Sequence, residues 1–218
     1  MKKWIESDLF ETLSKITDLM FFNILFLLLS VPVVTYGAAK TALYEVCLKM
    51  ADKKATGISD YLNRFRNNLK KQVIPGVIFT VWFSFAVSSS AFCIQMFLNE
   101  AGCADLWEKV LLLLSLISIF ICCGINEKFY LFSAQFEGEP TQQFINSIRF
   151  SLGYPLRSMI TAGLSSLPVF LVMTYPQLFI RSVFLFILIY FSAVSLTEIV
   201  LMRPVFKALK DSCVGRHS

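Results

Sequence analysis

The chain has 218 residues, of which 56% are hydrophobic and only 16% are charged, with a formal net charge of +5 at pH 7. Soluble domains carry about 25% charged residues, so a soluble fold of this size could not cover so much apolar surface, whereas lipid could. The basic residues flank apolar stretches rather than forming a separate domain, which argues against nucleic acid and favours anionic lipid head groups as their partner.

The N-terminal region predicts one or two helices that lead into the membrane. Residues 4–18 carry apolar side chains at steps of three and four, which predicts an amphipathic helix at the interface or an extension of the first span. The first span is predicted over residues 19–36, and its strongly polar Asn23 is expected to bond a neighbouring helix or a ligand. Pro32 should end or kink this helix, and Gly37 should let the chain change direction.

A basic connection follows, from Thr35 to Gln72. Its surplus of five positive charges equals the net charge of the whole chain, with eight basic residues (Lys40, Lys49, Lys53, Lys54, Arg64, Arg66, Lys70 and Lys71) against three acidic ones (Glu45, Asp52 and Asp60). The positive-inside rule places this connection in the cytoplasm. Within it, residues 38–51 predict an amphipathic helix on, or partly re-entering, the cytoplasmic face. A further interfacial helix is expected over residues 59–72.

Four more spans are predicted, at residues 73–98, 110–125, 158–175 and 178–202, with the alternative that the third continues through Phe136. The acidic connection 99–109 suits the outer side. The loop 126–157, with an interfacial helix that begins at Pro140, and the tail 203–218 suit the cytoplasm. The chain is therefore expected to be an all-α, polytopic transmembrane helical bundle in a single domain of the plasma membrane. Five crossings place the N-terminus outside; a sixth crossing by residues 36–51 would place it inside.

A weak internal repeat connects the two cytoplasmic loops. Residues 61–69 and 144–152 are identical at three aligned positions, which pair Asn63 with Asn146, Arg66 with Arg149 and Leu69 with Leu152. Such a pattern is consistent with a parallel duplication, a device found in transporters.

Two ionisable residues fall inside the fifth predicted span. Arg181 lies near its start and Glu198 near its end. A charge at the bilayer centre costs about 2.5–3.5 kcal/mol, so such residues either extend to an interface or face a polar cavity. Asn23, Arg181 and Glu198 are therefore the candidate intramembrane sites.

Signatures of enzymes and of metal sites are absent from the sequence. There is no phosphate-binding glycine loop, no GxSxG and no HExxH, and His217 is the one histidine. The six cysteines have no zinc-ligand spacing. We expect no catalytic activity, no metal and no cofactor.

The stretch NILFLLLSVPVVTYGAAKTALYEVCLK, followed by YLNRFRNNLKKQ, resembles the YesL family of bacterial membrane proteins. The resemblance rests on an Asn-led apolar helix, a turn that includes Pro32, Thr35 and Gly37, an Ala-Leu-Tyr segment that ends at Tyr44, and a basic helix. NSIRFSLGYPLR, residues 146–157, resembles the second cytoplasmic segment of the family. This resemblance implies a small polytopic protein of undefined biochemistry, often encoded near ABC-type carbohydrate importers in Gram-positive bacteria.

The sequence and the resemblance suggest two alternative functions, an accessory protein and a transporter. The favoured one is an accessory or regulatory component of carbohydrate import, with helices 38–51, 59–72 and 141–154 as its contact surface. The residues expected on that surface are Asn63, Arg64, Arg66, Asn68, Lys70, Lys71, Asn146 and Arg149. The alternative is a small self-sufficient transporter or channel for a polar solute, which could act as a homo-oligomer.

Overall fold

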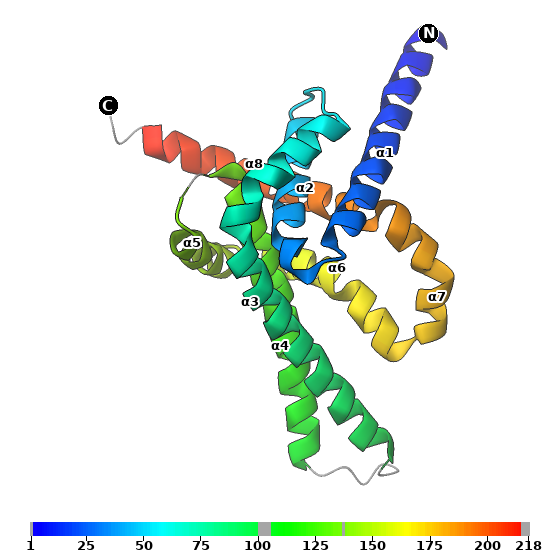
Figure 1. Cartoon of the computed structure of the whole chain (residues 1–218), viewed down its shortest axis with the longest axis vertical. Helices are drawn as coiled ribbons and strands as arrows, with labels where there is room; N and C mark the ends of the chain where they lie inside the picture. The colour runs from blue at the N-terminus through cyan, green and yellow to red at the C-terminus, as the bar shows by residue number, and fades with distance from the viewer. Residues whose placement is uncertain (1, 100–105, 137, 215–218) are drawn as a thin grey trace.

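The structure, a computed structural model, describes residues 2–99, 106–136 and 138–214. Every element in these ranges is helical, which confirms the expected all-α bundle (Figure 1). Most of the acidic connection 99–109 and the end of the tail, residues 215–218, lie outside the described residues. Within the described part, five helical segments are long and apolar enough to cross a membrane: Leu13–Ser30, Ile58–Gln95, Lys109–Gln135, Pro155–Thr174 and Pro176–Phe206.

The first helix, α1 (Lys2–Ser30), continues without a break from the N-terminal region through the first predicted span. Residues 4–18 thus extend that span rather than forming a separate helix. The helix ends two residues before Pro32, and a short 3₁₀ turn, η1 (Val33–Thr35), follows. The Thr35 hydroxyl lies 2.5 Å from the Leu29 carbonyl oxygen and 2.8 Å from that of Pro32, so its one hydrogen can be donated to an acceptor that the end of α1 leaves free.

Helix α2 (Tyr36–Ala51) lies in the interior of the bundle, where it packs against α1, α3, α4 and α8. Its first half is fully enclosed, from Gly37 to Tyr44. The helix therefore does not lie on the surface of the bundle, and its enclosed position is compatible with the other expected arrangement, partial re-entry. The physical reason is the row of small residues Ala38, Ala39 and Ala42, which allows neighbouring helices to approach closely.

Helices α3 (Ile58–Asn99) and α4 (Leu106–Gln135) form a long antiparallel pair that extends away from the rest of the molecule (Figure 1). The predicted interfacial helix 59–72 and the second span form one continuous helix, α3. Helix α4 continues ten residues beyond the predicted end of the third span at residue 125, so Glu127 and Lys128 are helical rather than part of a loop.

The remaining helices are α5 (Pro140–Gly153), α6 (Pro155–Thr174), α7 (Pro176–Leu185) and α8 (Phe191–Val214). The first three begin with proline, which lacks only a donor that the first turn leaves unused. A π-helical turn, η2 (Phe186–Tyr190), joins α7 to α8. The fifth predicted span is thus divided, and its two parts run in different directions (Figure 1).

Aromatic rings dominate the core around α2. Phe22, Phe26, Phe129 and Tyr130 are among its largest buried side chains. Gly37 of α2 meets Gly76 of α3 at the closest approach of these helices: a Cβ on Gly37 would lie 2.5 Å from the Gln72 carbonyl oxygen and 3.1 Å from Gly76 Cα. Gly37 therefore serves a helix contact rather than a change of chain direction.

Candidate functional site

Four helices place charged and hydroxyl side chains together in the interior. Lys40 Nζ of α2 lies 3.1 Å from Glu127 Oε1 of α4, and Lys128 Nζ of α4 donates to Thr161 Oγ1 of α6 at 2.8 Å. Lys128 also forms an ion pair with Glu198 of α8. The Tyr44 hydroxyl contacts both Glu127 and Glu198. We call these six residues (Lys40, Tyr44, Glu127, Lys128, Thr161 and Glu198) the buried network.

The local sequence explains why the network joins several helices. Consecutive residues of an α-helix project about 100° apart, so Glu127 and Lys128 face different neighbours. Glu127 therefore meets α2, and Lys128 meets α6 and α8. Gly124, one turn earlier on α4, lets α6 approach, since a Cβ there would lie 3.4 Å from Ala162 Cβ.

The charges of the network are almost fully removed from solvent. Lys128 and Glu198 are 0% exposed, Lys40 is 1% and Glu127 is 4%. Isolated charges at such positions would be very costly, and pairing each lysine with a glutamate offsets this desolvation. For Lys40, burial lowers the pKa, but Glu127, Tyr36 and Glu198 together raise it more, so the net shift is upward and the ammonium form is favoured.

Aromatic rings complete the surroundings of Lys40. Its Nζ lies 5.6 Å from the ring centre of Phe26, 5.4 Å from that of Tyr44 and 6.0 Å from that of Phe191. These distances fall within the range of cation–π attraction, which further stabilises the ammonium group in an apolar environment.

A cavity of about 330 Å³ adjoins one side of the network. Lys40 and Glu127 are part of its lining, together with Tyr36 and Asn126, and most of the remaining wall is apolar. Asn126 Nδ2 donates to the Tyr36 hydroxyl at 3.3 Å, whereas Asn126 Oδ1 has no hydrogen-bond partner. The cavity therefore offers an unused acceptor next to a charged pair, an arrangement that suits water or a small polar group.

Asn23 belongs to a separate polar contact. Its Nδ2 donates to the carbonyl oxygens of Phe186 (3.0 Å) and Ile187 (2.7 Å), and its Oδ1 accepts from the backbone N–H of Ser192 at 3.0 Å. All three backbone groups lie in or next to the π-helical turn η2, whose bonding pattern differs from that of the flanking α-helices. Asn23 thus bonds a neighbouring helix and fixes this turn against α1.

The three predicted intramembrane residues lie in three different environments. Glu198 belongs to the buried network, Asn23 binds η2, and Arg181 is exposed on α7. The structure does not bring Arg181 together with the other two. In the predicted family-like turn, Thr35 binds the end of α1, Pro32 is exposed, and Tyr44 bridges the two glutamates.

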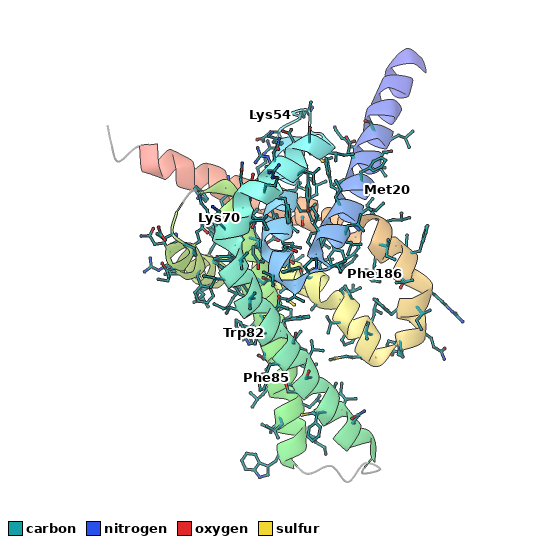
Figure 2. All side chains as sticks on the ribbon, in the orientation of Figure 1. Met20, Lys54, Lys70, Trp82, Phe85 and Phe186 are labelled. Atoms are coloured by element: carbon teal, nitrogen blue, oxygen red, sulfur yellow. The ribbon has the colours of Figure 1, made fainter. Side chains whose placement is uncertain are left out.

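The predicted basic surface is divided between structural and exposed residues. Arg64 is ion-paired with Glu45, and Asn68 Nδ2 donates to the same carboxylate at 2.7 Å, so both fasten α3 to α2. The exposed members of the predicted set are Asn63, Arg66, Lys70, Lys71, Asn146 and Arg149. Lys54 and Lys70 lie toward the same end of the molecule, and Trp82 and Phe85 lie farther along α3 (Figure 2).

We call the end of the molecule that carries Lys54 and Lys70 the basic end (Figure 2). A polar cleft of about 510 Å³ opens there, between α2, the first part of α3 and the α4–α5 connection. Asn63, Asn67 and Lys71 line one side, and Gln135 and Gln143 line the other. Gln72 and Gln135 also line the cleft, but their Oε1 atoms are buried without a hydrogen-bond partner. The polar groups that the cleft presents are therefore the exposed amides of Asn63 and Asn67 and the ammonium group of Lys71.

Sequence reasoning missed most of the buried network. The sequence predicts Lys40 on a surface or partly re-entrant helix, and it predicts Glu127 and Lys128 in a cytoplasmic loop unless the third span continues through Phe136, because charged residues are rare inside spans. A usable signal was present: Lys40 lies among Ala38, Ala39 and Ala42, and small residues mark close helix contacts. Within the described residues, no group of three or more His, Cys, Asp or Glu side chains could hold a metal ion.

The all-α fold and the apolar composition together identify the chain as a membrane-like helical protein, with five candidate spans in its described part. Residues 19–89 are similar to a family described as a protein of unknown function, DUF624. This match includes Lys40 and Tyr44 but ends before Glu127. No curated protein and no solved structure matches the chain.

Proposed function

We propose that this protein is a multi-pass plasma-membrane protein of the YesL type that acts as an accessory or regulatory partner of an ABC-type carbohydrate importer. In this proposal its basic end and C-terminus face the cytoplasm, and the importer docks there. No chemical reaction, metal or cofactor is involved. The resemblance of residues 23–72 to YesL proteins supports the link to carbohydrate import, and the basic charge of that region supports its orientation.

The polar cleft at the basic end is the observation that carries the proposal. A docking site for a polar peptide segment needs hydrogen-bond donors and acceptors that the protein itself does not use. Lys71 is exposed and forms no ion pair within the described residues, and the exposed amides of Asn63 and Asn67 lie on the same side of the cleft. Helix α2 contributes little to such a surface, because its first half is buried.

The intramembrane polar groups Asn23 and Glu198 are already engaged with partners inside the protein, which also supports an accessory role. A transporter that works alone needs polar groups along a path through the bilayer. Here Asn23 is engaged with backbone groups of η2, and Glu198 is enclosed between Lys128 and Tyr44.

Site-specific photocrosslinking in the native host tests the docking surface. A photoreactive amino acid at Asn67, in the cleft, should crosslink to a membrane subunit of a carbohydrate importer, identified by mass spectrometry. The same amino acid at Phe85, exposed in the part of α3 beyond the cleft, is the matched control and should give no such product. Lys71→Glu should reduce the Asn67 crosslink. A Phe85 product equal to that of Asn67 would contradict a specific cleft.

The second candidate, direct transport of a polar solute, has one observation in its favour: the 330 Å³ cavity beside Lys40 and Glu127. Uptake of labelled mono- and oligosaccharides by purified protein in liposomes separates the two functions. The accessory role predicts no uptake above empty liposomes. Direct transport predicts uptake that Glu198→Gln or Asn23→Leu abolishes, and that result would replace the first proposal.

A further inference from the structure

The bridge formed by Tyr44 has fewer hydrogens than its contacts require. The Tyr44 hydroxyl contacts Oε2 of Glu127 and also Oε2 of Glu198. A phenol has one hydrogen and donates one bond, whereas ionised carboxylate oxygens only accept. If both glutamates were ionised, one of the two contacts would join two oxygens with no hydrogen between them.

The two lysines cannot supply the missing hydrogen, because they face other atoms. Lys40 lies against Oε1 of Glu127, and Lys128 lies against Oε1 of Glu198 and against Thr161. Tyr44 retains its own hydrogen, since burial and the two carboxylates raise the pKa of Tyr44 well above its usual value. The bridge therefore needs one proton from a carboxylic acid.

We propose that the Glu127–Tyr44–Glu198 bridge is a proton-binding site, in which the two glutamates share one carboxylic proton while the surrounding solution is neutral. One glutamate, as the acid, donates to the Tyr44 oxygen, and Tyr44 donates its hydrogen to the other, which is ionised. Each contact then contains one hydrogen.

The groups that face the bridge come from every helix around it. The charged and titratable ones are Lys40 and Tyr36 on α2, Lys128, Cys123 and Tyr130 on α4, and Tyr190 at the end of η2. Helix α6 contributes the hydroxyls of Thr161 and Ser165, while the ring of Phe26 on α1 lies beside Lys40 and that of Phe79 on α3 lies in the wall of the adjoining cavity. With both lysines protonated, one shared proton gives the network a net charge of +1.

The proton can change sides without forming a phenolate. As the O–H bond of Glu198 breaks, its proton binds the Tyr44 oxygen, and the original Tyr44 hydrogen passes to Oε2 of Glu127. Glu198 is then the carboxylate beside Lys128, and Glu127 is the acid beside Lys40. The position of the proton therefore decides whether the ion pair joins α2 to α4 or α4 to α8. Glu127 also lines the 330 Å³ cavity, which gives the proton a route for exchange with water.

Infrared spectroscopy of the full-length protein in lipid nanodiscs tests this proposal. At about pH 7.5, an ordinary glutamate, with a pKa of about 4.3, is ionised and gives no carboxylic-acid carbonyl band. We expect one such band, equivalent to one group per chain, that shifts in D₂O and on ¹³C labelling of glutamate carboxyl groups. Glu127→Gln and Glu198→Gln should each abolish it, because a glutamine amide can donate to Tyr44 in place of the acid.

Glu45→Gln is the matched control, because Glu45 is also ion-paired but lies at the partly exposed basic end. The band should keep its full intensity in that variant. Gel filtration establishes which variants fold, and one folded variant of the pair is enough to assign the band. The isotope shifts need only the wild-type protein. Absence of the band from wild type, no shift with labelled glutamate, or an unchanged band in a folded Glu127→Gln or Glu198→Gln variant would overturn the proposal.

Discussion

The region around α2 and the far part of the α3–α4 pair are covered in different ways. Around α2, Tyr44 and Lys128 are fully enclosed by protein. Along the far part of α3, Val81 is 63% exposed and Phe85 is 74% exposed. Both regions are rich in apolar residues, so hydrophobicity alone does not distinguish them.

This contrast indicates which forces hold each region together. Lipid tails are as apolar as leucine, so the far part of the pair gains little from burying apolar side chains against protein. Around α2, stability depends on close packing and on satisfied polar groups. Losing one partner of a buried polar or charged pair there strongly destabilises the protein. Substitutions should therefore have large effects in the first region and small effects in the second.

The largest effect is expected from separating a charged pair. Lys40→Met/Lys128→Met leaves the one ionised glutamate buried without an ammonium partner, on whichever side the shared proton lies, and should destabilise the protein by about 3–5 kcal/mol. Lys40→Met/Glu127→Gln keeps the Lys128–Glu198 pair and should recover most of this loss. Unfolding in mixed detergent micelles, followed by circular dichroism, measures both. A Lys40→Met/Glu127→Gln variant as unstable as Lys40→Met/Lys128→Met would contradict the pairing.

Loss of the Asn23 side chain should have the next largest effect. Asn23→Leu leaves two carbonyl groups and one N–H at the π-helical turn without partners. Each orphaned group costs about 1–3 kcal/mol, and local rearrangement of the turn should limit the total to about 2–4 kcal/mol. Ile24→Leu, at the partly exposed neighbouring position of α1, is the control and should unfold like wild type. Equal stability of the two variants would show that η2 does not need Asn23.

The crossing of α2 and α3 allows a test with a single methyl group. Gly37→Ala forces a Cβ against the Gln72 carbonyl and should cost about 1–3 kcal/mol. Gly163→Ala is the matched change on α6, where a Cβ would meet nothing within 4 Å, and it should stabilise by about 0.5–1 kcal/mol through helix propensity. Thermal unfolding in detergent compares them. Opposite signs are expected, and a shared sign would argue against the close crossing.

The smallest effect is expected at the far part of α3. Phe85→Ala should change stability by no more than about 0.5 kcal/mol, because the ring contacts mainly the surrounding lipid or detergent. Phe129→Ala makes the same change at a side chain that is 1% exposed and should cost about 3–5 kcal/mol. Similar losses in the two variants would mean that another protein surface covers Phe85.

Much of the fold was predictable because apolar length is a strong signal in this sequence. The five-span count rests on that signal, and five candidate helices are present in the described part. The boundaries were less predictable, because charged residues are rare inside spans and their presence favours an early end for the third span. Glu127 and Lys128 break that rule because each has an oppositely charged partner on another helix.

The candidate site was predictable only in part, for a related reason. Glu198 stood out as an acid within an apolar stretch, but its partners Lys128 and Tyr44 lie far away in the sequence. The sequence FILIY of residues 186–190 is entirely apolar apart from Tyr190 and does not distinguish a π-helical turn from an α-helix. Only Asn23, a polar amide within an apolar span, indicated that a hydrogen-bonding partner was needed. Similarly, Arg64 was expected on a docking surface, although Glu45, 19 residues earlier, already binds it.

The continuity of α3 has a mechanical consequence. Its 42 residues make a helix about 63 Å long, roughly twice the thickness of a bilayer's hydrocarbon core. A large part of this helix must therefore project beyond the hydrocarbon layer. Pro75 lies between the first turns and the long apolar part of the helix, so a protein that binds the first turns acts on a segment joined to the embedded part at a point where the helix can bend.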